Sequence, residues 1–133
     1  EWKSANDSSL VLKVNYHNFT GLFTGDLEEA GEKEIINKLS HVNYLKVAHH
    51  GSKGASSEAF LEQVKPDVSV ISCGKKNRYG HPHKETLKRL ENIGSKVYRT
   101  DKEGAVSIEY QNGKWYLSLW KKESGKKRLL SDW

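Results

Sequence analysis

Segments that favour β-strands alternate with segments that favour α-helices along most of this chain. Residues 28–39, 58–64 and 83–93 have the composition and spacing of helices, and Ser57 is placed to cap the second of them. Because parallel strands need a crossover between them, this alternation predicts an α/β fold, a largely parallel sheet with helices packed against it. The strands are predicted at residues 9–16, 19–24, 44–48, 67–73, 96–100, 105–110 and 114–120. The first strand alternates apolar and polar residues, which predicts that one of its faces is buried.

The chain has 133 residues, enough for one domain, or part of one, that buries a core without disulfides. Its single cysteine, Cys73, ends an apolar run and is interpreted as a small buried hydrophobe. The net charge of +5 favours polyanionic partners, such as nucleic acid or an anionic membrane surface. No stretch approaches the roughly 20 apolar residues of a membrane span. The chain begins at Glu1, without methionine, and we expect it to be a piece of a longer polypeptide.

Three short clusters of polar residues follow predicted strands or the loops after them. They are Gly25-Asp26, the segment 49–52 (His-His-Gly-Ser) and the segment 80–83 (Gly-His-Pro-His). In α/β proteins the carboxyl ends of the strands converge on one edge of the sheet, where chemistry is usually placed. Asp and His are side chains that bind a divalent metal and move protons near neutral pH. The clusters therefore predict part of a metal-dependent hydrolase site.

The first two clusters each allow a second interpretation. Asp26 can ligate a metal, but taken alone it is more typical of a turn residue that caps the helix beginning at Glu28. His49 and His50 end an apolar strand, so one can be a ligand while the other packs or hydrogen-bonds. The alternative is a pair of solvated loop histidines. Gly51 allows a substrate or another backbone segment to approach closely.

The third cluster belongs to a polar loop, residues 74–83, that leads into a helix. Its charged and polar side chains can hold a phosphate, and His81 can donate a proton or a hydrogen bond to a developing negative charge. The residues predicted to bind substrate phosphate are Lys76, Asn77, Arg78, Ser52 and His83. The alternative is a solvated basic loop in which His83 lies near the helix cap. Residues 100–104 are predicted to be a plain turn between two strands.

Together these segments resemble the C-terminal metallo-β-lactamase-like domain of the ComEC family of DNA-uptake channel proteins. The resemblance covers about residues 6–110. It rests on residues 6–12 (NDSSLVL), 23–26 (FTGD), 45–52 (LKVAHHGS), 77–83 (NRYGHPH), 98–101 (YRTD) and 104–105 (GA). It implies an αββα sandwich, a mixed sheet arrangement with flanking helices, of which residues 1–120 would form the C-terminal portion. The basic tail, residues 121–133, is expected to be disordered.

The resemblance also implies roles for individual residues. Asp26 would bridge two metal ions, His49 or His50 would be a ligand of one of them, and His81 would lie near the site. The metal would be zinc or manganese, binuclear in the intact domain. The H-x-H-x-D-H segment of that superfamily does not occur in this chain and would lie upstream. We therefore expect the isolated chain to bind metal weakly, or not at all, and to be poorly active.

The function predicted for the intact protein is a metal-dependent phosphodiesterase, a nuclease acting on incoming DNA. Its partners would be DNA and the remainder of the same polytopic membrane protein, with this domain on the outer face of the cell membrane and no small organic cofactor. Two alternatives stay open. The domain guides DNA without cutting it, or it is a hydrolase of the same fold with another substrate.

Overall fold

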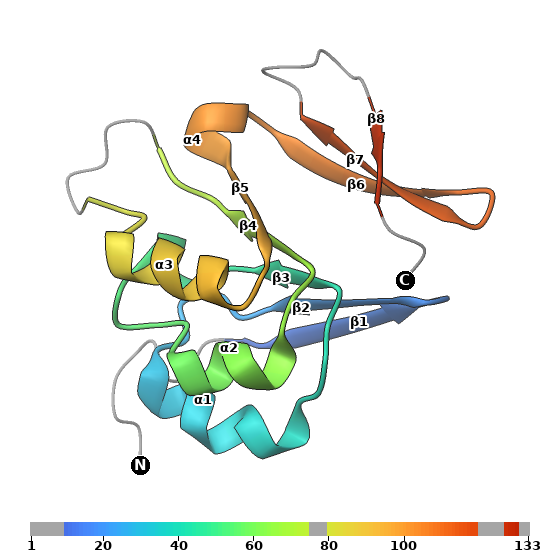
Figure 1. Cartoon of the computed structure of the whole chain (residues 1–133). Helices are drawn as coiled ribbons and strands as arrows, with labels where there is room; N and C mark the ends of the chain where they lie inside the picture. The colour runs from blue at the N-terminus through green and yellow to red at the C-terminus, as the bar shows by residue number, and fades with distance from the viewer. Residues whose placement is uncertain (1–9, 75–79, 120–126, 131–133) are drawn as a thin grey trace.

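The computed structural model describes residues 10–74, 80–119 and 127–130. Its larger sheet has five strands in the order β1-β2-β3-β4-β5. β1 and β2 form an antiparallel hairpin, whereas β2 to β5 run parallel to one another, as Figure 1 shows. The strands span Leu12–Tyr16 (β1), Phe19–Phe23 (β2), Tyr44–Lys46 (β3), Val68–Ile71 (β4) and Lys96–Arg99 (β5). The carboxyl ends of four strands therefore share one edge.

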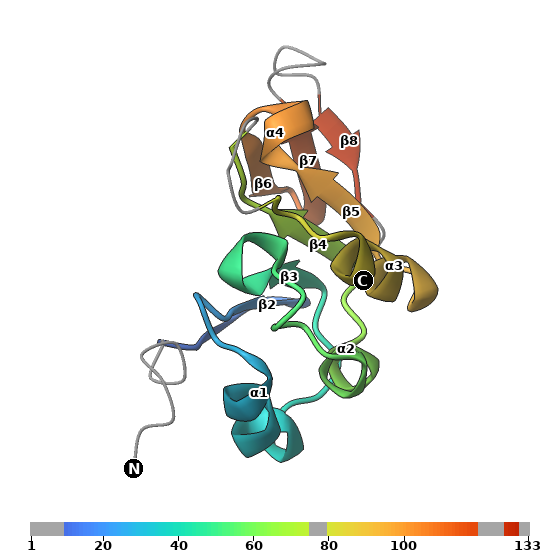
Figure 2. The same ribbon diagram turned by 90° about the vertical axis from the view of Figure 1, so that its left-hand side faces the viewer.

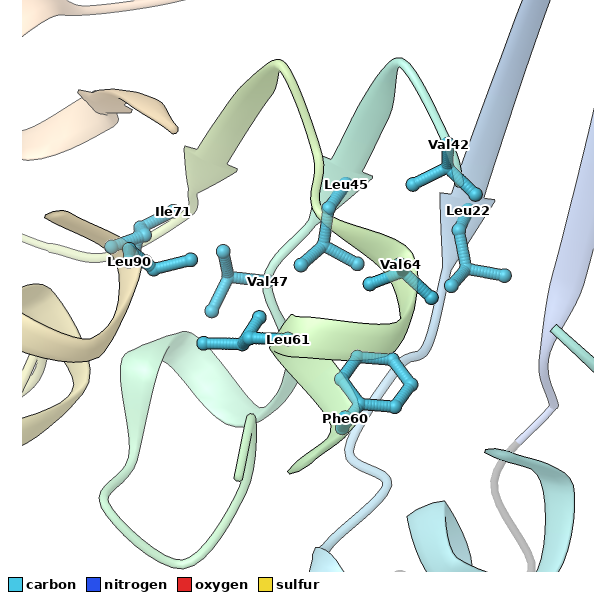
Figure 3. Close-up of a cluster of buried hydrophobic side chains, with 9 residues drawn as sticks. All are labelled: Leu22, Val42, Leu45, Val47, Phe60, Leu61, Val64, Ile71 and Leu90. Carbon is cyan, nitrogen blue, oxygen red and sulfur yellow. The ribbon is translucent and has the colours of Figure 1, made fainter. Parts of the chain in front are cut away.

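Three helices cover one face of this sheet (Figure 1). They span Glu29–Ile35 (α1), Glu58–Val64 (α2) and Lys84–Asn92 (α3), and single 3-10 turns occupy Ile36–Lys38 (η2) and Ala48–Gly51 (η3). The predicted cap of α2 is confirmed, because Ser57 Oγ accepts a hydrogen bond from the Phe60 amide at 3.2 Å. Figure 3 shows the core between helices and sheet, formed by Leu22, Val42, Leu45, Val47, Phe60, Leu61, Val64, Ile71 and Leu90.

A second, antiparallel sheet packs against the other face. It consists of β6 (Val106–Gln111), β7 (Lys114–Leu119) and β8 (Lys127–Leu129). In Figure 2 it lies above β2, β3 and β4, whereas α1 and α2 lie below them. Asn112 and Gly113 close the β6–β7 hairpin with φ angles of +52° and +81°, as expected for an Asn-Gly turn. The core between the sheets contains Phe19, Val68, Val70, Trp115, Leu117, Leu119 and Leu130.

The described residues thus form three layers, helices, mixed sheet and antiparallel sheet. The predicted α/β class, with a mixed sheet flanked by helices, is confirmed. The full αββα sandwich stays a prediction.

The prediction that β1 buries one face is wrong. Every residue of β1 is exposed, and the alternating apolar side chains of Leu10, Leu12, Val14 and Tyr16 are 44–73% exposed. Of these side chains, Tyr16 contacts the second sheet, with its ring centroid 5.4 Å from that of Tyr110 and 6.2 Å from that of Trp115. The described residues therefore cover this face of β1 too sparsely to bury it.

Two segments differ in detail from expectation. Residues 127–129 of the basic tail form β8, which pairs with β7, and the Leu130 amide donates to the Trp115 carbonyl at 2.8 Å. Leu130 is 6% exposed, so this one apolar side chain anchors the segment. The predicted turn at residues 100–104 contains a single helical turn, α4 (Thr100–Glu103). Among the described residues, no helix combines the length and hydropathy of a membrane span.

Candidate functional site

The carboxyl ends of β2, β3, β4 and β5 carry the polar segments singled out in the sequence. Gly25, at φ +58°, turns the chain after β2 and is followed by the exposed Asp26. η3 follows β3 and contains both adjacent histidines. Ser72 and Cys73 follow β4, and α4 follows β5. The convergence predicted from parallel strands is therefore present in the structure.

Asp26 and His50 line one cavity of about 190 Å³ at this edge. Its other lining residues are Gly25, Lys46, Val47 and Ser72. The N-cap residue of α1 is Glu28, not Asp26, and Glu28 makes no side-chain cap bond. The carboxylate of Asp26 lines the cavity together with the imidazole of His50. Both interpretations of Asp26, metal ligand and turn residue, stay predictions.

The hydrogen bonding of His50 decides which of its ring nitrogens can act as a ligand. His50 Nδ1 lies 2.8 Å from the carbonyl oxygen of Ser72. A carbonyl can only accept, so Nδ1 carries the proton in the neutral ring and Nε2 keeps its lone pair. Metal-ligating histidines are held in the same way, with the second ring nitrogen donating to a carbonyl or carboxylate. His50 is thus a suitable ligand, whereas the side chain of His49 lies outside the part that the structure describes.

His83 is held in the opposite tautomer. The backbone amide of Lys53 donates to His83 Nδ1 at 2.8 Å. A backbone amide can only donate, so the neutral ring of His83 carries its proton on Nε2. His83 is also the N-cap residue of α3, although it makes no side-chain cap bond. It can therefore donate a hydrogen bond from Nε2, the role that suits a substrate oxygen.

His81 lies between the other two imidazoles. Its ring centroid is 6.2 Å from that of His50 and 4.8 Å from that of His83. Two contacts hold these loops together: the His83 amide donates to the Gly51 carbonyl at 3.0 Å, and Pro82 packs directly over Gly51. The second and third sequence clusters therefore form one unit in space.

The remaining predicted substrate-binding residues are less informative. Ser52 Oγ accepts a hydrogen bond from the Gly54 amide at 3.3 Å, and its carbonyl accepts one from Thr86 Oγ1 at 3.1 Å. Ser52 is thus engaged in the local turn, and its phosphate-binding role stays a prediction. The three loop residues Lys76, Asn77 and Arg78 lie outside the described residues.

Sequence reasoning missed two side chains that hold the loop after the histidines. The buried carboxylate of Glu32, on α1, accepts hydrogen bonds from the amides of Ser56 and Ser57. The guanidinium of Arg89, on α3, donates to the carbonyls of Ser56, Ala55 and Lys53 at 2.9, 3.0 and 3.2 Å. A carboxylate from α1 and a guanidinium from α3 thus hold the backbone of residues 53–57 through hydrogen bonds. Both residues occupy helix positions where charged side chains are usually solvated, so their spacing carried no signal.

Burial makes the stabilising contribution of the Glu32 carboxyl group sensitive to pH. Glu32 is 1% exposed, and this burial raises its pKa above the ordinary value of 4.5, against the lowering effect of the two amide hydrogen bonds. A raised pKa means that the folded state holds the proton more tightly, so this contribution to stability is present at low pH and is lost as pH rises. Compared with Glu32→Gln, the wild-type chain should therefore lose stability as pH rises from below 4.5 towards neutrality.

Urea unfolding of both proteins over that pH range measures the effect. Glu62→Gln, at an exposed position of α2, is the matched control for the removal of one carboxylate from a helix. Parallel curves for wild type and Glu32→Gln would show that the carboxyl titrates normally.

Sequence reasoning also missed two sets of side-chain contacts at the carboxyl ends of β4 and β5. Thr100 Oγ1 accepts from the Cys73 amide at 3.0 Å and donates to the Cys73 carbonyl at 3.1 Å. Arg99 holds Asp101 through two hydrogen bonds of 2.7 and 3.1 Å, which lower the pKa of that carboxyl. Cys73 is half-buried against the helix-side core, and burial raises the pKa of its thiol. The two Cys73–Thr100 hydrogen bonds join the ends of β4 and β5, which a plain turn would not do.

The cavity holds part of the donor set that a zinc or manganese ion requires. Asp26 and His50 supply one carboxylate and one imidazole nitrogen, both suitable donors for these ions. Among the residues that the structure describes, no three His, Cys, Asp or Glu side chains gather closely enough to hold a metal ion. A catalytic zinc usually has three protein ligands, so these two residues fit a metal as part of a ligand set.

Comparison with known proteins places the chain in a family. No family model matches it. ComE operon protein 3 of Bacillus subtilis is 43% identical over 111 residues, covering 82% of this chain and 14% of the relative. Recombination protein 2 of Haemophilus influenzae is 36% identical over 108 residues, covering 81% and 14%. Competence protein ComA of Neisseria gonorrhoeae is 37% identical over 111 residues, covering 81% and 16%.

These matches take in most of this chain but only 14–16% of the length of each relative. The resemblance that the sequence motifs suggested is confirmed by them. The chain therefore belongs to the ComEC family of competence proteins and corresponds to a small part of its longer members.

Proposed function

We propose that this chain contributes part of the active site of a metal-dependent phosphodiesterase that cuts DNA during uptake. The observation that carries the proposal is the shared cavity of Asp26 and His50, in which the Nε2 lone pair of His50 is left available. A carboxylate and an oriented imidazole at the carboxyl edge of a parallel sheet are suited to metal-assisted hydrolysis. The remaining ligands would come from residues beyond these two.

The described residues would have separate roles in metal binding and in substrate binding. Asp26 and His50 would hold a divalent metal, zinc or manganese, in the intact domain as one of a pair. When bound, such ions supply a nucleophile at neutral pH and stabilise the charge that develops on phosphate oxygens. His83 offers the Nε2–H bond fixed by the Lys53 amide, and His81 lies between His83 and His50. These two rings would donate hydrogen bonds to the substrate phosphate or to the leaving oxygen.

The choice of DNA as substrate has separate support. One relative's name refers to competence and another's to recombination. The net charge of +5 suits a polyanionic substrate. We further propose that the chain works as a domain of a polytopic membrane protein and that it lies on the outer face of the cell membrane, where incoming DNA arrives.

The test is cleavage of labelled single- and double-stranded DNA with added Mn²⁺ or Zn²⁺. It uses the protein extended upstream to include the H-x-H-x-D-H segment that the family resemblance implies. We expect cutting that requires the metal and that stops when a chelator removes it, because the two described ligands have no catalytic power without the ion.

Two other outcomes would overturn the proposal in different ways. DNA binding that falls steeply with salt, without any cutting by a folded and metal-loaded protein, would indicate a module that guides DNA. Turnover of small esters without DNA cleavage would indicate a hydrolase of another substrate class.

A further inference from the structure

Lys46 is the cationic side chain among the residues that line the Asp26–His50 cavity. It is the last residue of β3, three positions before the first histidine of η3. Its position is fixed by the strand on both sides: its Cα is paired with Phe23 of β2 and with Val70 of β4. Thr24 Oγ1 also donates to its carbonyl at 3.4 Å. The ammonium is therefore presented from a rigid part of the sheet.

The face on which Lys46 lies makes a charged residue unexpected there. Residues paired in register point to the same face of a sheet, and Val70 belongs to the apolar core between the two sheets. Tyr44, two residues before Lys46, lies on the same face and packs against that core. Lys46 is half-buried. A lysine at such a position lowers the apolar area available for packing, so its charge needs another explanation.

No partner for the ammonium occurs within the described residues. Asp26 lines the same cavity, yet the two side chains form no ion pair, and the Lys46 ammonium makes no hydrogen bond to any residue of the described ranges. A protonated lysine has three donors and no lone pair, so it does not ligate a metal. It is, however, a compact point charge that binds phosphate oxygens. The cavity thus combines two metal-binding groups with one group that binds anions.

We propose that Lys46 binds a non-bridging oxygen of the substrate phosphodiester while Asp26 and His50 hold the metal. This inference rests on the proposed function. An anionic phosphate between the ammonium and the metal would attract both positive charges, which otherwise repel each other. Lys46 is in this way a substrate-binding residue on β3, separate from the lysine and arginine of the loop 74–83.

A lysine can also serve only to cover apolar surface with its stem, and the test separates this role from phosphate binding. Lys46→Met keeps the length of the stem and removes the charge, whereas Lys46→Arg keeps the charge. The upstream-extended, metal-loaded protein is titrated with inorganic phosphate and with a short DNA strand. We expect Lys46→Met to weaken both about 10- to 100-fold, the size of a lost charge-assisted hydrogen bond. Lys46→Arg should retain most of the binding.

Two further readouts and a matched control make the result specific. The slope of DNA affinity against salt should fall by about one phosphate contact in Lys46→Met. Its affinity for Mn²⁺, measured by electron paramagnetic resonance, should be unchanged or higher. Lys96→Met is the matched control, because Lys96 is an exposed strand lysine at the opposite edge of the same sheet and should change none of these values.

The proposal would be overturned if Lys46→Met bound phosphate and DNA as tightly as the wild-type protein. An equal loss of phosphate and DNA affinity in Lys96→Met would also overturn it. Failure of the wild-type protein to bind phosphate would overturn it too. Phosphate binding that depends on Lys46 in a protein that cuts no DNA would sustain the Lys46 contact and refute the nuclease. The two proposals therefore fail separately.

Discussion

Replacing His50 with alanine is expected to lower metal-dependent DNA cleavage by more than about 100-fold, because losing even the hydrogen-bond partner of a metal-ligating histidine costs about 10- to 100-fold. His50 Nδ1 is 2.8 Å from the Ser72 carbonyl, which makes Nε2 the ring atom that can bind the proposed metal. Removing the ring therefore removes both the ligand and its orientation. The measurements are the cleavage rate and the affinity for Mn²⁺ of the upstream-extended protein.

His41→Ala is the matched control for this substitution. His41 is an exposed histidine, 3.2 Å from Asp67, and no catalytic role is assigned to it. It should retain wild-type cleavage and metal affinity. Full metal affinity in His50→Ala would exclude His50 as the ligand and transfer the role to His49.

The second large effect is expected from Gly51→Ala, which should destabilise the chain by about 2–4 kcal/mol. Gly51 has φ +81°, a region that disfavours any residue with a Cβ. A Cβ added there would also lie 2.5 Å from Pro82 Cβ, so one of the two loops must move. Because Pro82 separates His81 from His83, the movement should misplace both rings. Cleavage should then fall further than the loss of folded protein accounts for.

Gly113→Ala separates the cost of the positive φ from the cost of the contact with Pro82. Gly113 has the same φ of +81°, in the β6–β7 turn, but nothing lies within 4 Å of the position of its Cβ. It should show only the backbone cost, about 1–2 kcal/mol, with cleavage unchanged per folded molecule. Equal destabilisation of the two variants, measured by urea unfolding, would rule out a tight contact between Gly51 and Pro82.

Much of the fold follows from local pattern. The alternation of strands and helices gave the parallel order of β2 to β5, and Asn112-Gly113 gave the β6–β7 turn. The failure at β1 has a physical cause, since an apolar alternation reports that a face can be buried, while burial depends on what lies over it. β8 was missed because a single residue, Leu130, anchors a segment whose composition is otherwise polar.

The candidate site was predictable only in part. The gathering of Asp26 and His50 follows from strand ends that share an edge. The opposite tautomers of His50 and His83 depend on hydrogen bonds to Ser72 and Lys53, residues 22 and 30 positions away along the chain. Such contacts leave no periodicity in a sequence. Lys46 was missed for a related reason. In the sequence of a short strand, a lysine that lines a cavity looks the same as a lysine that is exposed to solvent.

The backbone conformation of His50 lowers the stability of the chain at the position of a proposed metal ligand. His50 has φ +53°, in the left-handed region where a residue with a side chain is disfavoured by about 1–2 kcal/mol. Glycine would relieve this strain, but it has no imidazole to offer. Selection for a more stable chain alone would therefore favour glycine at this position. If His50 is the ligand that we propose, the protein accepts a less stable backbone here in exchange for an imidazole with a fixed direction.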